Sequence, residues 1–294
     1  KEEIEAWQSF DPINSYAKEL SDAGMLTEEA IASRKSDVVS AMTKAFGLAS
    51  DLEVSPRLPS EKIAGLMFSS RKRESYDSDR EPELLLKHDE NPRVQALAKK
   101  SRAGVIDGKP VSKNKVFQYR DAIFEAALHR FETDPTMVAY GEENRDWGGA
   151  FACYRGLTES LPYHRLFNSP ISEAAIVGSA VGYALEGGRA LVELMYCDFM
   201  GRAGDEIFNQ LAKWQSMSAC ILEMPVVLRV SVGSKYGAQH SQDWSAIVSH
   251  IPGLQVVFPS TPYDAKGMLN TALAGSDPVI FFESQRLYDI GELF

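Results

Sequence analysis

Hydrophobic and polar positions follow three different patterns along this chain. In residues 1–53 the apolar positions recur at helical spacing, and two glutamates after Thr27 suit the positive end of a helix. Residues 54–115 are polar, charged and interrupted by Pro and Gly, whereas apolar runs dominate from residue 116 onward. We therefore predict a helical tail over 1–53 that packs on something larger, a linker with a little local helix over 54–115, and an α/β domain over 116–294.

The strand candidates of this α/β domain have no polar face. Each is apolar throughout, and helical patterns lie between them. Such alternation is typical of a mostly parallel sheet with helices on both faces, so we predict an α/β fold of this kind. The predicted strands are MVAYG, ALVELM, MPVVLRVSV, LQVVFP and PVIFFE, and the predicted helices are FQYRDAIFEAALHRFE, ISEAAIVGSAVGYALEGG and TPYDAKGMLNTALA.

The charge balance narrows the classes of partner. The formal net charge is -10, which repels phosphate backbones, so we expect no nucleic acid partner. No apolar run approaches the roughly 18 residues that a membrane span needs, so we expect no membrane insertion. The three cysteines, Cys153, Cys197 and Cys220, form no close pair, which favours reduced thiols in a cytoplasmic protein.

Two side chains occupy positions that suit chemistry. Glu173 follows a plausible N-cap, Ser172, and either stabilises the helix start by roughly 0.3–1 kcal/mol or serves proton transfer at the mouth of a site. Periodicity alone favours the first alternative. His240 lies in a loop beyond a predicted strand, where α/β sheets bind ligands, although a single histidine is more often structural. A nucleophilic pair of Cys220 with His240 lacks an orienting third group.

The glycines supply no phosphate-binding motif. Neither a Walker loop nor a dinucleotide fingerprint is present, and the nearest cluster, GSAVG, lies inside a predicted helix. Ala174, Gly178 and Gly182 are spaced by four and share one helix face. Small residues there indicate close packing of another backbone, for example at a subunit interface.

Ordered segments between Tyr119 and Tyr288 resemble one enzyme family, the beta subunit of the 2-oxo acid dehydrogenase first component. The resemblance implies a thiamine-diphosphate-binding fold. It also implies a parent enzyme that decarboxylates a 2-oxo acid, such as pyruvate or a branched-chain acid, and transfers the acyl group to a lipoyl domain. The segments are VAYGEENRDWGGAF, RLFNSPISEAAIVGSAVGYALEGGRALVE, CDFMGRAGDEIFNQLAKWQSMS, GAQHSQD, HIPGLQVVFPSTPYDAKGML and DPVIFFESQRLY.

The resemblance implies roles for five residues. Glu173 matches the glutamate of the family's PISE motif, which hydrogen-bonds the cofactor's aminopyrimidine ring and so promotes removal of the thiazolium proton. Phe199 matches the aromatic residue that stacks on the pyrimidine, and Met195 lies where the cofactor pocket is often lined. Glu142 matches a glutamate linked to proton relay. His240 matches the histidine of the HSQ motif, implicated in handling the substrate-derived intermediate and in lipoyl transfer.

Residues 1 to about 52 resemble the C-terminal helices of the family's alpha subunit, best in EAWQSFDPI. This implies a fused chain that forms a homo-oligomer, with the diphosphate and Mg²⁺ bound by an upstream alpha-type domain and no metal ligands here. We expect the present segment to be inactive alone. The alternatives are a transketolase-like enzyme, against which the HSQ motif and the tail argue, and a non-catalytic assembly module, against which Glu173 argues. The family's usual DTPISE reads NSPISE here, and the identity of the 2-oxo acid stays open.

Overall fold

A computed structural model describes residues 2–8, 10–233 and 236–292 of the chain. Two compact units result, Lys1–Ser60 and Glu61–Phe294. The first unit contains the helices α1 (Glu2–Gln8), α2 (Pro12–Asp22) and α3 (Glu28–Ser50). As predicted, α3 begins after Thr27, whose hydroxyl accepts a hydrogen bond from the amide of Ala30 at 3.2 Å.

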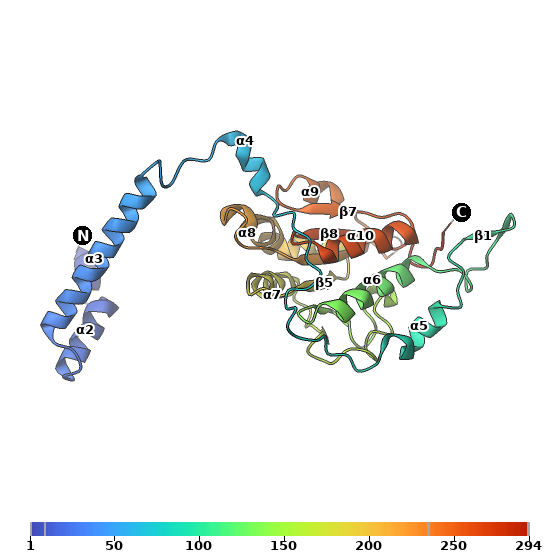
Figure 1. The fold of residues 1–294 in the computed structure, drawn as a ribbon, viewed down its shortest axis with the longest axis horizontal. Helices are drawn as coiled ribbons and strands as arrows, with labels where there is room; N and C mark the ends of the chain where they lie inside the picture. The colour runs from blue at the N-terminus through green and yellow to red at the C-terminus, as the bar shows by residue number, and fades with distance from the viewer. Residues whose placement is uncertain (1, 9, 234–235, 293–294) are drawn as a thin grey trace. The chain divides into compact units, whose positions relative to one another are not determined.

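Within the described residues, the second unit is built on a parallel sheet of six strands, in the order β4-β3-β5-β6-β8-β7. This confirms the predicted α/β fold (Figure 1). The edge strand β4 is not among the strands predicted from the sequence. The strands are β3 (Val138–Gly141), β4 (Leu166–Asn168), β5 (Ala190–Leu194), β6 (Val226–Val232), β7 (Gln255–Val257) and β8 (Val279–Ser284).

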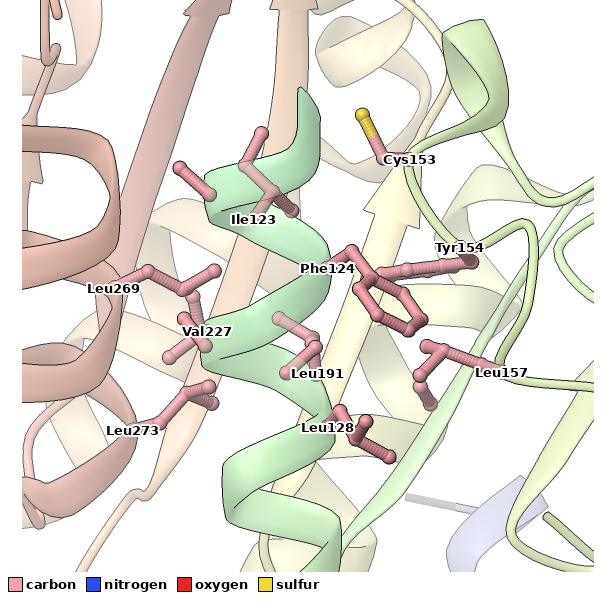
Figure 2. Packing of buried hydrophobic residues seen from close by; sticks show 14 of the residues in the cluster. Ile123, Phe124, Leu128, Cys153, Tyr154, Leu157, Leu191, Val227, Leu269 and Leu273 are labelled. Atoms are coloured by element: carbon pink, nitrogen blue, oxygen red, sulfur yellow. The ribbon is translucent and has the colours of Figure 1, made fainter. Parts of the chain in front are cut away.

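Helices cover both faces of this sheet. On one face, α6 (Tyr119–Thr133) packs against α10 (Pro262–Ala274) and against strand residues such as Leu191 and Val227, as Figure 2 shows. The neighbouring strand residues Val192 and Leu228 point into the core of the opposite face. Because both faces are buried, neither side of the strands faces water, which explains why their residues are mainly apolar.

The second face is covered by α7 (Glu173–Leu185) together with several short helices. Buried apolar residues of α7, among them Val177 and Val181, pack with the strands and with these helices. Glu173, the first residue of α7, lies just beyond the end of β4. The short helices are η4 (Cys197–Ala203), η5 (Glu206–Leu211), α8 (Ala212–Met217), η6 (Ala238–His240) and α9 (Ser245–Ser249).

Residues 61–115, here called the arm, differ from the solvated linker that their composition suggests. Glu223 accepts hydrogen bonds from Arg71, Arg73 and Tyr76, and Asp277 accepts hydrogen bonds from the backbone amides of residues 69 and 70. The charged run thus binds the domain. The arm contains η1 (Ala64–Leu66), η2 (His88–Glu90), α5 (Pro92–Leu97), β1 (Val105–Ile106) and β2 (Lys109–Pro110), while α4 (Ser60–Ile63) spans its start.

Candidate functional site

The five site residues predicted from the sequence all follow the carboxyl ends of strands in the parallel sheet. Glu142 follows β3, Glu173 follows β4, Met195 follows β5, Phe199 lies in η4, and His240 lies in η6 beyond β6. In open α/β sheets the crevice outside the carboxyl ends of the strands is where ligands bind. The topology therefore gathers these residues at one edge of the sheet, and their individual roles stay predictions.

Glu142 and Glu173 form a pair of carboxylates at this edge. Both side chains are half-buried. Partial burial raises the pKa of Glu142, and the negative charges of Glu173 and Glu143 raise it further. Glu142 therefore holds a proton more readily than an isolated glutamate, while sharing an electrostatic environment with Glu173.

Glu173 occupies the position that its motif predicts. It is the first residue of α7, and Ser172 before it has the non-helical angles φ -162° and ψ 78° of a cap residue. The hydroxyl of Ser172 makes no capping hydrogen bond, although its carbonyl accepts one from the amide of Ile176 at 2.9 Å.

His240 belongs to a cluster of rings. Its ring centroid lies 4.7 Å from that of Tyr196 and 5.4 Å from that of Phe199, both in edge-to-face geometry. Its Nδ1 lies 3.2 Å from the carbonyl oxygen of Tyr236, so the neutral ring donates from Nδ1 and presents Nε2 as an acceptor. A side-chain carbon at Gly233 would lie 1.7 Å from the carbonyl oxygen of His240, so glycine is required there.

Met195 lies directly between β5 and this ring cluster. Its carbonyl oxygen accepts a hydrogen bond from the hydroxyl of Ser231, which ties the end of β5 to β6. Its side chain is half-buried. The structure thus brings His240 and Phe199 into contact, sets Glu142 near Glu173, and places Met195 next to Tyr196.

Sequence reasoning missed a buried charge cluster beneath this edge. Arg229 of β6 donates to Glu193 of β5 at 2.7 Å and to Glu283 of β8 at 2.5 and 2.7 Å. All three side chains are almost completely buried. A signal was present, because each is a charged residue within an otherwise apolar strand segment: ALVEL, VVLRVSV and VIFFES.

The cluster supports the loops that frame the site. The amide of Ala150 donates to Glu193 at 2.6 Å, and the hydroxyl of Tyr288 donates to Glu283 at 2.6 Å. Two carboxylates share one guanidinium, and burial raises the pKa of Glu193 to about 6 despite the opposing effect of Arg229. The cluster therefore carries one buried negative charge more than it neutralises when both glutamates are ionised.

Asn144 is an unsatisfied polar group close to Glu142. It is fully buried, and neither atom of its amide has a hydrogen-bond partner in the described residues. Buried amides are rarely left without partners, so such a group calls for an explanation.

No cluster of three or more potential metal ligands occurs in residues 2–8, 10–233 and 236–292, and no helix of these ranges is long and apolar enough to cross a bilayer.

Comparison with known proteins places these features in a family. The model of the family described as "Transketolase, pyrimidine binding domain" matches residues 115–290. The chain is 44% identical over 181 residues to the acetoin:2,6-dichlorophenolindophenol oxidoreductase subunit beta of Cupriavidus necator, covering 58% of this chain and 53% of that protein. It is 39% identical over 175 residues to the 2-oxoisovalerate dehydrogenase subunit beta of Bacillus subtilis, covering 59% and 54%.

A third relative is the mitochondrial pyruvate dehydrogenase E1 component subunit beta-2 of Oryza sativa subsp. japonica, 38% identical over 182 residues that cover 61% of this chain and 48% of that protein. The chain thus spans about half the length of these curated relatives. Among solved structures, a chain described as "Split gene transketolase, inactive beta4 tetramer" matches 60% of this chain and 54% of its own length at 20% identity, with a TM-score of 0.47.

Proposed function

This chain belongs to the transketolase pyrimidine-binding-domain family, and we propose that it supplies the residues that bind the pyrimidine ring of thiamine diphosphate in an enzyme that decarboxylates a 2-oxo acid. The observation that carries the proposal is the position of Glu173 beside Glu142 at the carboxyl edge of the parallel sheet. The relatives named for 2-oxoisovalerate and pyruvate dehydrogenases support the choice of a 2-oxo acid.

The residues present fit an aminopyrimidine ring. Such a ring needs a carboxylate at a ring nitrogen and an apolar face to stack on, and Glu173, Phe199 and Met195 offer both at one edge of the sheet. The unpartnered amide of Asn144 is a further sign that an additional group completes this region. Thiamine diphosphate, when bound, supplies the carbon nucleophile and the electron sink that decarboxylation requires.

Glu173 is the proposed proton-transfer group, and Glu142 tunes its surroundings. Partial burial and the nearby charge of Glu173 raise the pKa of Glu142, so Glu142 binds a proton more tightly than an isolated glutamate does. A general acid–base group works best with a pKa near the operating pH, and a raised pKa at Glu142 moves in that direction. Glu142 is therefore suited to relay a proton.

His240 is proposed to handle the substrate-derived intermediate and transfer to a lipoyl domain. Its Nε2 is the acceptor of the neutral ring, and Tyr196 and Phe199 hold the ring in place. The remaining components of the proposal are an alpha-type domain that binds the diphosphate and Mg²⁺, a homo-oligomer of fused chains, and a cytoplasmic location. The free state of the described cysteines suits such a location.

Exchange of Glu173 for Gln tests the proposal. In the full-length protein assembled with its diphosphate-binding domain, we expect Glu173→Gln to slow proton exchange at the cofactor's thiazolium carbon by about 10²–10⁴-fold. The melting temperature should stay near that of the wild type, because Gln preserves the size of the side chain. Glu186→Gln, at the exposed far end of α7, is the matched control and should leave the exchange rate unchanged. Exchange at the wild-type rate in Glu173→Gln would refute the role.

A further inference from the structure

A pocket lies beside the ring cluster of the site. It has a volume of about 380 Å³, and Phe151, Tyr236 and Tyr288 form its apolar wall. Phe151 also contacts the ring of Tyr196, with centroids 6.4 Å apart, and the carbonyl oxygen of Tyr236 contacts His240. The pocket and the proposed active site therefore share a wall.

The charge of this pocket is opposite to that of the protein. Its charged lining consists of Lys113, Arg120, Arg286 and Asp289, which amounts to three cationic groups and one carboxylate. The whole chain has a formal net charge of -10. A local excess of positive charge in an acidic protein attracts a negatively charged ligand to this one place.

Two of the three cations already have partners. Asp289 pairs with Lys113 at 3.0 Å and with Arg120. Arg120 also donates to the carbonyl oxygens of Phe151 at 3.1 Å and Tyr288 at 3.3 Å, which fixes its guanidinium in the wall.

Arg286 is the cation left for a ligand. It is exposed at the end of β8, and within the described residues no hydrogen bond or ion pair of its side chain is found. An arginine guanidinium is a planar fork of donors that matches the two oxygens of a carboxylate. The unpaired guanidinium of Arg286, the apolar wall and the excess of positive charge together make a site for a small organic carboxylate.

We propose that Arg286 and this pocket bind the carboxylate group of the 2-oxo acid, an inference that rests on the proposed function. Glu142 and Glu173 lie across the site at the ends of β3 and β4 and repel an anionic substrate from that side. The carboxylate group of the substrate is then held toward Arg286, and its 2-oxo carbon lies toward the ring cluster around His240. Arg286 thus selects acids over neutral ketones of similar size.

A comparison of KM for charged and for neutral donor substrates tests the inference. In the full-length holoenzyme we expect Arg286→Gln to raise KM for pyruvate or for 3-methyl-2-oxobutanoate by about 10- to 100-fold, the loss expected for a charge-assisted hydrogen bond. KM for acetoin, a neutral donor, should not change. Arg286→Lys should recover part of the affinity for acids. Arg155→Gln removes another exposed arginine outside the pocket and should leave both KM values unchanged.

Binding of a carboxylate that cannot react separates this inference from the proposed function. Line broadening of the NMR signals of 2-methylpropanoate should be seen with the wild type and lost with Arg286→Gln. Loss of broadening supports the pocket even if the wild type decarboxylates no 2-oxo acid, an outcome that would overturn the proposed function instead. Equal broadening by both proteins, an unchanged KM for acids, or an equal rise in KM for acetoin would each overturn the role of Arg286.

Discussion

Glu193 in the buried charge cluster makes a quantitative prediction about stability. The cluster holds two carboxylates and one guanidinium away from water, and burial raises the pKa of Glu193 from its ordinary 4.5 to about 6. Replacing Glu193 by Gln removes the titrating group while keeping the shape of the side chain. Its amide oxygen can still accept the hydrogen bond from the amide of Ala150.

The pH dependence follows from the direction of this pKa shift. Because the folded state holds the proton of Glu193 more tightly than the unfolded state, the wild type is favoured by low pH and loses stability as pH rises from about 4.5 to about 6. A difference of 1.5 pKa units corresponds to about 2 kcal/mol. Gln does not titrate, so Glu193→Gln should not show this loss.

The measurable quantity is the difference in unfolding free energy between Glu193→Gln and the wild type. Urea denaturation at about pH 4 and about pH 7 gives this difference, and we expect it to be about 2 kcal/mol more favourable to the variant at the higher pH. Tryptophan fluorescence is a suitable signal because Trp147, Trp214 and Trp244 all lie in the second unit. The other titrating groups are common to both proteins and largely cancel.

A constant offset between the two proteins is compatible with the reasoning. Gln has one acceptor oxygen, so a donor of Arg229 loses its partner at every pH, at a cost of about 1–3 kcal/mol. Only the dependence of this difference in unfolding free energy on pH reports on the pKa of Glu193. A difference that stays flat between the two pH values, or that favours the wild type more at about pH 7, would refute the argument. Glu186→Gln, at an exposed position outside the cluster, is the matched control.

Two further substitutions test other parts of the molecule. His240→Ala in the full-length enzyme should lower lipoyl acylation in a steady-state assay by about 10²-fold or more while calorimetry finds little change in melting temperature, and normal acylation would leave His240 a structural residue. Asp277→Ala leaves the amide of Ser70 without an acceptor and leaves the amide of Ser69 with Gln215 alone, so hydrogen exchange of arm residues 69–74 should accelerate about 10-fold or more. Unchanged exchange would contradict the anchoring role of Asp277, and Asp79→Ala at an exposed position is the control.

The central sheet was predictable because burial on both faces leaves a strong local signal. The runs around Leu191, Leu228 and Phe281 contain so few polar residues that each strand stands out. The edge strand β4 has three residues, of which only Leu166 is fully buried, so it carries too short a pattern to recognise. Periodicity favoured a structural role for Glu173, whereas its place in the PISE motif predicts a role in the site.

Contacts between distant parts of the sequence could not be read from local patterns. Arg73 looks like a solvated charge, and its partner Glu223 lies 150 residues away. Likewise, Glu193 and Arg229 look like isolated charges in apolar strands until strand pairing places them opposite one another. A charged residue in the middle of a buried strand is still a usable sign, because burial without a partner would be too costly.

The anchoring of the arm has a consequence for the order in which the chain folds. The hydrogen bond from the amide of Ser69 to Asp277 closes a loop of 208 residues, and the pair of Arg73 with Glu223 closes one of 150. Closing such loops in an open chain loses conformational entropy with no local contact to offset it. Both acceptors occupy their places only once the sheet and α10 have assembled. We therefore expect the arm to attach last on refolding and to detach first on unfolding, as a cooperative unit separate from the sheet.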